Sequence, residues 1–317
     1  MCTAINERCT RHIFGRTLDL ECSLGEHVVI TPRRAPLEFL HLPKKNEHPA
    51  IIGAAHLTSR AALYYDAMNE EGLCAAALSF PLECKYLPPT SSAGELASFE
   101  VIPYLLSNAA SVSEARDLLS GKRITNESFS SNLPPTPLHW IFADKSSAIT
   151  VEQTEYGLII HDNPIGVLSN SPNFSAQIAN LERYAHIIMG GEEIRGLHSR
   201  GLCGFGIPGD FSSGSRFVRA VYNKKTARAE QEKTAALTRF FHLLDTVAQP
   251  LGATHTEDGR LVSTVYSSAM DVDSLEYCFT TYDDRRIRRV KLMSARMGGA
   301  LPISYPMHAP EDICNLN

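Results

Sequence analysis

The residue best suited to do chemistry in this sequence is the cysteine at its second position. The small side chain of Cys2 permits removal of Met1, which would leave Cys2 with a free α-amino group. An α-amino group has a pKa of about 7.7 to 8.0, so a useful fraction is neutral near pH 7 and can accept a proton. One residue would then supply both a thiol nucleophile and its general base, without any histidine.

Two charged residues on a neighbouring segment could support this chemistry. Residues 3–8 and 12–16 have the composition of two strands joined by a short turn. Such a hairpin would bring Arg16 and Asp19 back beside Cys2. The charge of an arginine favours a thiolate, and an aspartate can accept N–H bonds from an amine. The pattern therefore predicts a cysteine nucleophile supported by these two side chains.

The sequence motifs of nucleotide-binding sites, metalloproteases and serine hydrolases are either absent or lack the expected structural context. Residues 204–209 match G-x-G-x-x-G, but no strand–turn–helix unit surrounds them, and Pro208 with Asp210 disfavours a phosphate there. We expect a tight loop that uses the freedom of glycine. The chain has no Walker A sequence, no H-E-x-x-H and no G-x-S-x-G. His139, beside Trp140 in a strand pattern, is expected to be structural.

The eight cysteines lack the spacing of a metal site. None forms a C-x-x-C pair, and none is spaced with histidine as zinc requires, so no metal or other cofactor is expected. In a reducing compartment, the seven besides Cys2 are expected to be reduced and mostly buried thiols.

Length and composition narrow the class of protein. The chain has 317 residues, 44% of them hydrophobic, and no linker or internal repeat divides it, so we expect a single domain over residues 1–317. The 30 Lys and Arg against 35 Asp and Glu, a net charge of −5, argue against a nucleic-acid partner. No apolar window approaches the roughly 18 to 20 residues of a membrane span, and arginines interrupt the first apolar stretch. A cytoplasmic protein without a signal peptide is expected.

The expected elements follow the order strands, helices, strands, helices, strands. Besides the N-terminal hairpin, strands are expected at 27–32, 50–56, 63–68, 72–80, 138–143, 148–153, 157–161, 262–269, 277–282 and 287–293. Helices are expected at 99–110, 115–119, 175–189, 215–225 and 233–247. The large apolar residues of the loop at 125–137 either rim a pocket or pin the loop to the core. This order predicts an α+β protein with layered antiparallel sheets.

Taken together, the sequence resembles the choloylglycine hydrolase family, the bile salt hydrolases and penicillin V acylases of the N-terminal nucleophile superfamily. The resemblance covers nearly the whole chain. It rests on blocks that stand in the family's order: residues 1–4 (MCTA), 14–19 (FGRTLD), 66–73 (DAMNEEGL), 138–140 (LHW), 151–153 (VEQ), 166–172 (GVLSNSP), 206–210 (GIPGD) and 215–219 (SRFVR).

The resemblance implies a four-layer αββα sandwich of the N-terminal nucleophile hydrolase type, usually assembled as a homotetramer. It also implies cleavage of a linear amide by a cysteine nucleophile. In this family pattern Cys2 is the nucleophile and its amine is the base. Arg16 lies beside the thiol, and Asp19 holds the amine.

The same resemblance assigns three more residues. It implies that the main-chain N–H of Ser79 and the side-chain amide of Asn170 hold the oxyanion. It also implies that Arg216 completes the polar network, whereas its helical pattern alone would place it in a surface ion pair. Position 79 is a departure, because bile salt hydrolases carry Asn there and penicillin acylases commonly carry Tyr. A main-chain donor survives such a substitution, so activity is expected to be kept.

The resemblance also implies a binding surface for the acyl group. Six residues are expected to line it: Leu18, Tyr65, Phe129, Leu133, Thr136 and Leu138. This set is apolar enough to bury a steroid. Residues 64–66 and 198–201 also resemble the bile salt hydrolases more than the acylases. The leading hypothesis is hydrolysis of glycine- and taurine-conjugated bile acids.

Three alternatives stay open at this point. The nearest is a penicillin V acylase, whose acyl group is phenoxyacetyl. A second is transfer of the acyl group from a thioester to a free amino acid. The third, motivated by Ser79, is a steroid-binding protein on the same fold without catalysis.

Overall fold

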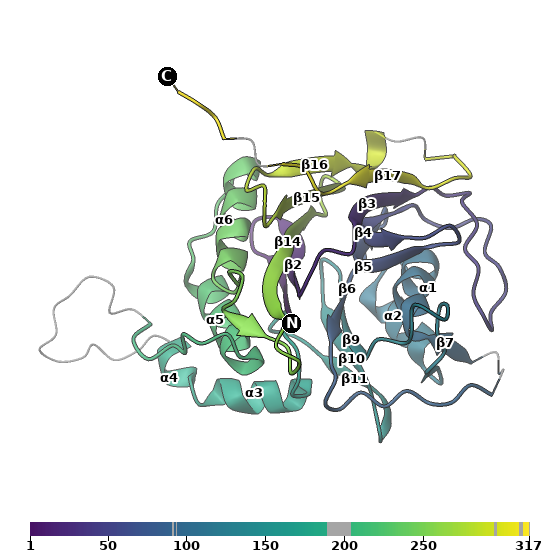
Figure 1. The fold of residues 1–317 in the computed structure, drawn as a ribbon, viewed down its shortest axis with the longest axis horizontal. Helices are drawn as coiled ribbons and strands as arrows, with labels where there is room; N and C mark the ends of the chain where they lie inside the picture. Colours follow the sequence, from purple (N-terminus) through teal and green to yellow (C-terminus); the bar gives the residue numbers. More distant parts are fainter. Residues whose placement is uncertain (91, 93, 189–203, 295–296, 311–312, 317) are drawn as a thin grey trace, which may run out of the picture.

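The computed structural model describes the chain except for residues 91, 93, 189–203, 295–296, 311–312 and 317. Two large sheets lie face to face, and helices cover the outer face of each (Figure 1). The layers therefore run helix, sheet, sheet, helix. This arrangement confirms the predicted α+β class and the αββα sandwich.

The first sheet contains both strands of the predicted N-terminal hairpin. Its order is β12 (Val167–Leu168), β1 (Cys2–Arg8), β2 (His12–Leu20), β14 (Leu261–Asp271), β15 (Glu276–Thr281) and β16 (Arg288–Lys291), with β13 (Thr254–His255) paired to β14. The hairpin register places Cys2 opposite Leu18 and Ala4 opposite Arg16. Because side chains alternate along a strand, Cys2, Arg16 and Leu18 share one face, and Asp19 lies on the other.

The second sheet lies opposite that face. Its order is β11 (Gly157–Asp162), β10 (Ala148–Thr154), β9 (Leu138–Ala143), β6 (Cys74–Ser79), β5 (Ala62–Asn69), β4 (Ile51–Leu57), β3 (Glu26–Thr31) and β17 (Ile303–Pro306). A small parallel pair stands apart from it, formed by β7 (Glu95–Ala97) and β8 (Arg123–Thr125).

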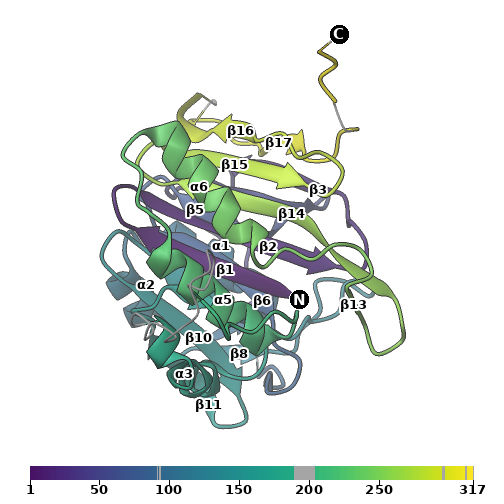
Figure 2. The same ribbon diagram turned by 90° about the vertical axis from the view of Figure 1, so that its left-hand side faces the viewer.

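The helices divide between the two outer faces. Those after β12 lie on the side of the first sheet: α3 (Phe174–Glu182), α4 (Ala185–Ile188), α5 (Ser213–Thr226) and α6 (Lys233–Asp245). Figure 2 shows α5 and α6 crossing in front of β1, β2 and β14. The second sheet is covered by α1 (Val101–Asn108) and α2 (Val112–Leu119), with a 3₁₀ turn at Ser98–Glu100; another follows β16 at Leu292–Ser294. None of the helices described is long and apolar enough to cross a membrane.

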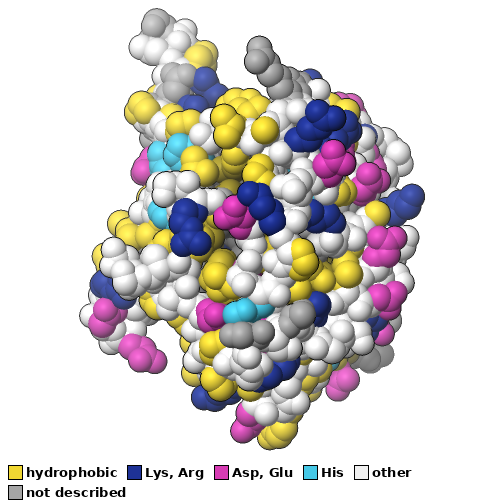
Figure 3. All heavy atoms as spheres, turned by 90° about the vertical axis from the view of Figure 1, so that its right-hand side faces the viewer, with side chains coloured by type: hydrophobic (Ala, Val, Ile, Leu, Met, Phe, Trp, Pro, Cys, Tyr) yellow, Lys and Arg dark blue, Asp and Glu magenta, His cyan; other side chains and the backbone are white. Residues whose placement is uncertain are grey.

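Two apolar clusters hold the layers together. The larger joins the facing sheets and continues beneath α5 and α6, and the smaller lies between the second sheet and α1 and α2. On the face drawn in Figure 3, lysines and arginines lie among aspartates and glutamates rather than gathering into one basic patch.

The structure corrects some local predictions. The helix expected at 175–189 is divided into α3 and α4 around Arg183 and Tyr184, and its last residue lies outside the described part. Five short strands were not predicted: β7, β8, β12, β13 and β17. The expected glycine loop is present, because Gly204 and Gly206 have φ of 82° and 90°.

The prediction of mostly buried thiols was wrong for three cysteines. The seven cysteines in the described part, Cys2 included, are free. Cys9, Cys22 and Cys314 are exposed, because they lie in the hairpin turn, in the loop after β2 and near the C-terminus. Cys203 and the stretch 198–201 lie outside the described residues.

Candidate active site

Cys2 lies at the beginning of β1, where this strand meets the second sheet. The residue is only 3% exposed, and it lines a cavity of about 570 Å³ between the two sheets. The residue thus borders a cavity that is partly open to solvent, which is the position that a nucleophile for an incoming substrate requires.

Arg16 lines the same cavity and connects the two sheets. Its side chain is fully buried, and Nη1 donates to the carbonyl oxygens of Tyr65 (3.1 Å) and Ala77 (2.5 Å) on the second sheet. Nη2 has no hydrogen-bond partner among the described residues. Burial opposes the charge, but the neighbouring Cys2 thiol and Asp66 raise the pKa of Arg16 above its usual value. A fixed positive charge thus stands beside the thiol and can favour its anionic form.

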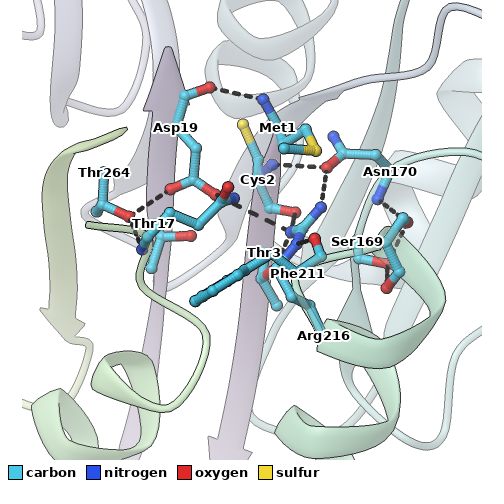
Figure 4. Close-up of polar contacts among 12 residues, drawn as sticks. Met1, Cys2, Thr3, Thr17, Asp19, Ser169, Asn170, Phe211, Arg216 and Thr264 are labelled. Atoms are coloured by element: carbon cyan, nitrogen blue, oxygen red, sulfur yellow. Dashed lines mark hydrogen bonds and ion pairs between the residues drawn. The ribbon is translucent and has the colours of Figure 1, made fainter. Parts of the chain in front are cut away.

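The nitrogen of Cys2 is held by Asn170, which follows β12. It donates to Asn170 Oδ1 at 2.6 Å (Figure 4). Asn170 Nδ2 in turn donates to the Ser79 carbonyl oxygen at 2.8 Å. The expected donor to the oxyanion is thus already bonded to the main chain of the second sheet. The amide nitrogen carries two hydrogens, so this one bond leaves it a second. Asn170 joins the nucleophile to the opposite sheet.

Arg216, in the first turn of α5, is fully buried behind Cys2. Nη1 donates to the Cys2 carbonyl oxygen (2.5 Å) and to Thr3 Oγ1 (2.6 Å), and Nη2 donates to Asn170 Oδ1 (2.7 Å). The surface ion pair suggested by its helical pattern is therefore wrong, because its side chain points inward to the end of β1 (Figure 4). Burial lowers the pKa of Arg216, against the opposing effect of Asp19.

Asp19 has different partners from those expected. Its carboxylate accepts hydrogen bonds from Thr264 Oγ1 and Gln249 Nε2, both at 2.7 Å, and lies 4.0 Å from Arg216 Nη1. Its main-chain oxygen, rather than its carboxylate, accepts a bond from the Met1 ammonium group at 2.6 Å. While Met1 is present, the Cys2 nitrogen is a peptide nitrogen that Asn170 holds instead.

Ser79 lies at the end of β6, beside the cavity. The next residue, Phe80, donates its N–H to Pro137 on the β9 side. Because neighbouring residues of a strand direct their main-chain groups to opposite edges, the N–H and carbonyl of Ser79 face the other edge, toward Asn170. The Ser79 N–H thus points to the same side as the amide that holds Cys2.

The cavity brings together the residues predicted to bind the acyl group. Leu18, Tyr65, Phe129, Leu133, Thr136 and Leu138 all line it, as do Cys2, Arg16 and Ser79. The remaining predicted residues, Asp19, Asn170 and Arg216, lie behind Cys2 and outside this lining. Phe129 packs edge to face on Phe99 at 5.2 Å, so the loop at 125–137 contributes to the pocket rim.

Sequence reasoning missed the residues that hold Asp19 and Asn170 in place behind Cys2. Thr264 lies opposite Asp19 in the pairing of β2 with β14, and Gln249 reaches the same carboxylate from the loop after α6. Ser213 Oγ accepts a bond from the main-chain N–H of Asn170. No local motif marks these residues, and only the order of strands and helices in space brings them to the site.

The comparisons with known proteins agree with this geometry. The sequence model of the linear amide C–N hydrolases of the choloylglycine hydrolase family matches residues 2–305. The chain belongs to this family and is therefore a member of a class of linear amide hydrolases. A bile salt hydrolase/transferase of Lactiplantibacillus plantarum is 40% identical to it over 316 residues, which cover 98% of each chain.

Solved structures of the same fold extend the comparison. The C2A mutant of the conjugated bile acid hydrolase of Clostridium perfringens superposes with a TM-score of 0.90 at 27% identity, and each chain is covered completely. A penicillin V acylase of Agrobacterium tumefaciens has the same fold, with a TM-score of 0.78 at 20% identity over 98% of this chain and 92% of its own.

Proposed function

We propose that this protein hydrolyses the amide bond of glycine- and taurine-conjugated bile acids, with Cys2 as nucleophile. The observation that carries the proposal is the position of the Cys2 thiol at a largely apolar cavity that is partly open to solvent, with the nitrogen of the same residue held by Asn170. The family and the relative from L. plantarum, a bile salt hydrolase/transferase, support the choice of substrate.

Activation requires removal of Met1. The peptide nitrogen of Cys2 would become an α-amino group while staying next to Asn170 Oδ1. Met1 also lines the cavity, so its loss would enlarge the space beside the thiol. The new amine carries additional hydrogens that could turn to Asp19, which holds Met1 before processing.

The reaction then proceeds through a thioester. The amine takes the proton of the Cys2 thiol, and the sulfur attacks the amide carbonyl carbon. The Ser79 N–H and the free hydrogen of the Asn170 amide hold the oxyanion, as expected from the resemblance. The carbon–nitrogen bond breaks as the amine returns the proton to the leaving nitrogen. Water, deprotonated by the same amine, attacks the thioester, releases the bile acid and restores the thiol.

The cavity fits a steroid acyl group. Its volume of about 570 Å³ lies within the usual range of small-molecule pockets. Apolar side chains from both sheets line it, and burial of a rigid hydrocarbon contributes about 25 cal/mol per Å². Arg16 supplies a buried positive charge near the scissile bond.

One experiment tests the nucleophile. Intact mass and release of glycine from glycocholate are measured for the wild type and for Cys2→Ser. Both second residues are small enough for Met1 to be removed, so processing is matched. We expect the wild type to lack Met1 and to be active, and Cys2→Ser to lose more than about 10³-fold in kcat. A processed wild type that cleaves no linear amide would refute the assignment.

A second experiment tests the substrate. Release of glycine from glycocholate is compared with release of 6-aminopenicillanic acid from penicillin V by the same preparation. We expect a higher kcat/KM for the bile salt. Faster cleavage of penicillin V would contradict the proposed substrate and indicate a penicillin V acylase. Binding of taurocholate without any product would indicate a steroid-binding protein without catalysis.

Acyl transfer is a second candidate, favoured by the name hydrolase/transferase of the L. plantarum relative. A free amino acid could attack the thioester in place of water. Adding excess amino acid and analysing the bile acid products by mass spectrometry would reveal new conjugates. From the resemblance we also propose a homotetramer, for which native mass spectrometry should show four chains of 34.9 kDa. The arginines that interrupt the first apolar stretch support a cytoplasmic location.

A further inference from the structure

A buried histidine lies directly behind the proposed site. His139 on β9 and Glu152 on β10 stand opposite each other in the sheet, and both are 0% exposed. His139 Nδ1 lies 3.1 Å from Glu152 Oε1, and its Nε2 lies 2.7 Å from the carbonyl oxygen of Ser169. The next residue after Ser169 is Asn170, which holds the nitrogen of Cys2.

Both partners of this ring are hydrogen-bond acceptors. A neutral imidazole carries only one N–H, so it can satisfy only one of them, whereas an imidazolium satisfies both. The alternative is a protonated Glu152. Burial opposes the carboxylate, but hydrogen bonds from His139 and His161 and from the Phe174 N–H lower the pKa of Glu152 to about 2. The ionised carboxylate accepts a hydrogen bond rather than donating one, so both ring nitrogens of His139 face acceptors.

The same ring also contacts the other side of the site. Phe80 stacks on His139 with ring centroids 4.5 Å apart and planes within 5°. Phe80 directly follows Ser79, whose carbonyl oxygen accepts a bond from Asn170 Nδ2. A cation stacked on an aromatic face is favourable. One side chain therefore touches the neighbours of both proposed oxyanion donors.

We propose that His139 is a positioning residue of this site: held as an imidazolium by Glu152, it fixes Ser169 and Phe80 and so sets Asn170 and Ser79 relative to Cys2. It does not touch the reacting atoms. The expected effect of His139 on kcat rests on the proposed function, whereas the charge state of its ring does not. The charged groups that face the ring pair within the described residues are Glu152 itself and His161, whose Nε2 lies 3.3 Å from Glu152 Oε2.

Two variants separate positioning from simple packing. In His139→Gln the amide nitrogen has about the reach of Nε2 and can still donate to Ser169. In His139→Asn it has about the reach of Nδ1 and can bond only Glu152. We expect His139→Asn to lower kcat up to about 10²-fold with little change in KM, since small displacements of catalytic groups cost that much. His139→Gln should recover most of the loss. Equal losses in both variants would overturn the positioning role.

His161→Gln is the matched control, because His161 faces the same carboxylate without contacting Ser169. Its kcat should stay near the wild-type value. The rate of Cys2 alkylation by iodoacetamide, measured by mass spectrometry, gives a readout that needs no substrate. This rate should be lower in His139→Asn than in His139→Gln, and His161→Gln should stay near the wild type. If the wild type fails to cleave glycocholate, the proposed function fails, while the alkylation rates still test the positioning.

The charge state has its own test. In protein labelled with ¹⁵N-histidine, the signals that disappear in His139→Gln belong to His139. We expect both of its ring nitrogens to carry a hydrogen at pH 7, because each faces a hydrogen-bond acceptor. In Glu152→Gln the ring should become neutral. A single protonated nitrogen in the wild type at pH 7 would refute the imidazolium.

Discussion

Some residues of this site have buried contacts that differ from those their sequence context suggests. Arg216 has the sequence context of a surface helix, yet its guanidinium is fully enclosed and bonds the Cys2 carbonyl, Thr3 and Asn170. Cys2 was easier to predict, because its place beside a removable methionine is a property of the sequence itself. The proposed nucleophile could thus be chosen from residue type and position, but its contacts in the folded chain could not be predicted.

Ser79 gives a prediction at the scale of one residue. If its main-chain N–H serves the oxyanion, Ser79→Ala should keep kcat for glycocholate within about threefold, because the substitution leaves that donor in place. The measurement is steady-state hydrolysis of glycocholate. A loss of about 10²-fold would show that the serine hydroxyl itself contacts the developing charge.

The N-terminal hairpin directs its side chains to two different sides of the first sheet. Along β2, Arg16 and Leu18 face the cavity, and Asp19 faces α5 and the loop after α6 because the side chains alternate. Most strands and helices were predicted within a few residues. The short strand β12, which carries the chain to Asn170, was missed because it has only two residues and no pattern of its own.

Gly15 gives a prediction at the scale of these elements. A Cβ atom added there would lie 1.9 Å from the Ser268 carbonyl oxygen on β14 and 2.8 Å from the Phe240 ring on α6. Gly15→Ala should therefore lower the free energy of unfolding by about 1–3 kcal/mol and displace the adjacent Arg16. Urea denaturation and glycocholate hydrolysis would measure the two effects.

Gly209→Ala is the control for that substitution. No heavy atom lies within 4 Å of a Cβ atom built at this position, and its φ is not in the left-handed region. Its free energy of unfolding should change by less than about 0.5 kcal/mol. Equal effects of the two substitutions would contradict the close approach of β2 and β14.

At the scale of the whole molecule, stability should depend on pH through buried groups. Burial lowers the pKa of His12 to about 4 from 6.5. As the pH falls from 6.5 to 4, the unfolded chain takes up a proton that the folded chain does not, so the free energy of unfolding falls. For His12 alone the loss is on the order of 3 kcal/mol. Glu152, with a pKa of about 2, adds a further loss below pH 4.5.

Urea denaturation at pH 7, 5.5 and 4.5 would measure this effect. His12→Gln keeps a donor for Asn6, which bonds His12 Nε2 in the wild type at 2.8 Å, and removes the titrating group. Its free energy of unfolding should fall less steeply between pH 6.5 and 4. The same slope in both proteins would show that His12 does not control acid stability.

The sequence was sufficient to propose Cys2 as the nucleophile and to predict the hairpin that carries Arg16 and Asp19, the layered sheets and the six cavity-lining residues. These follow from residue type, short spacing and family blocks, all of which are local in the chain. The partners of buried polar atoms needed the folded chain. Cys2 and Asn170 are 168 positions apart, and Asp19 and Gln249 are 230 apart. Such pairs are fixed by how sheets and helices pack, because a buried polar group must find its hydrogen bond wherever packing brings a partner.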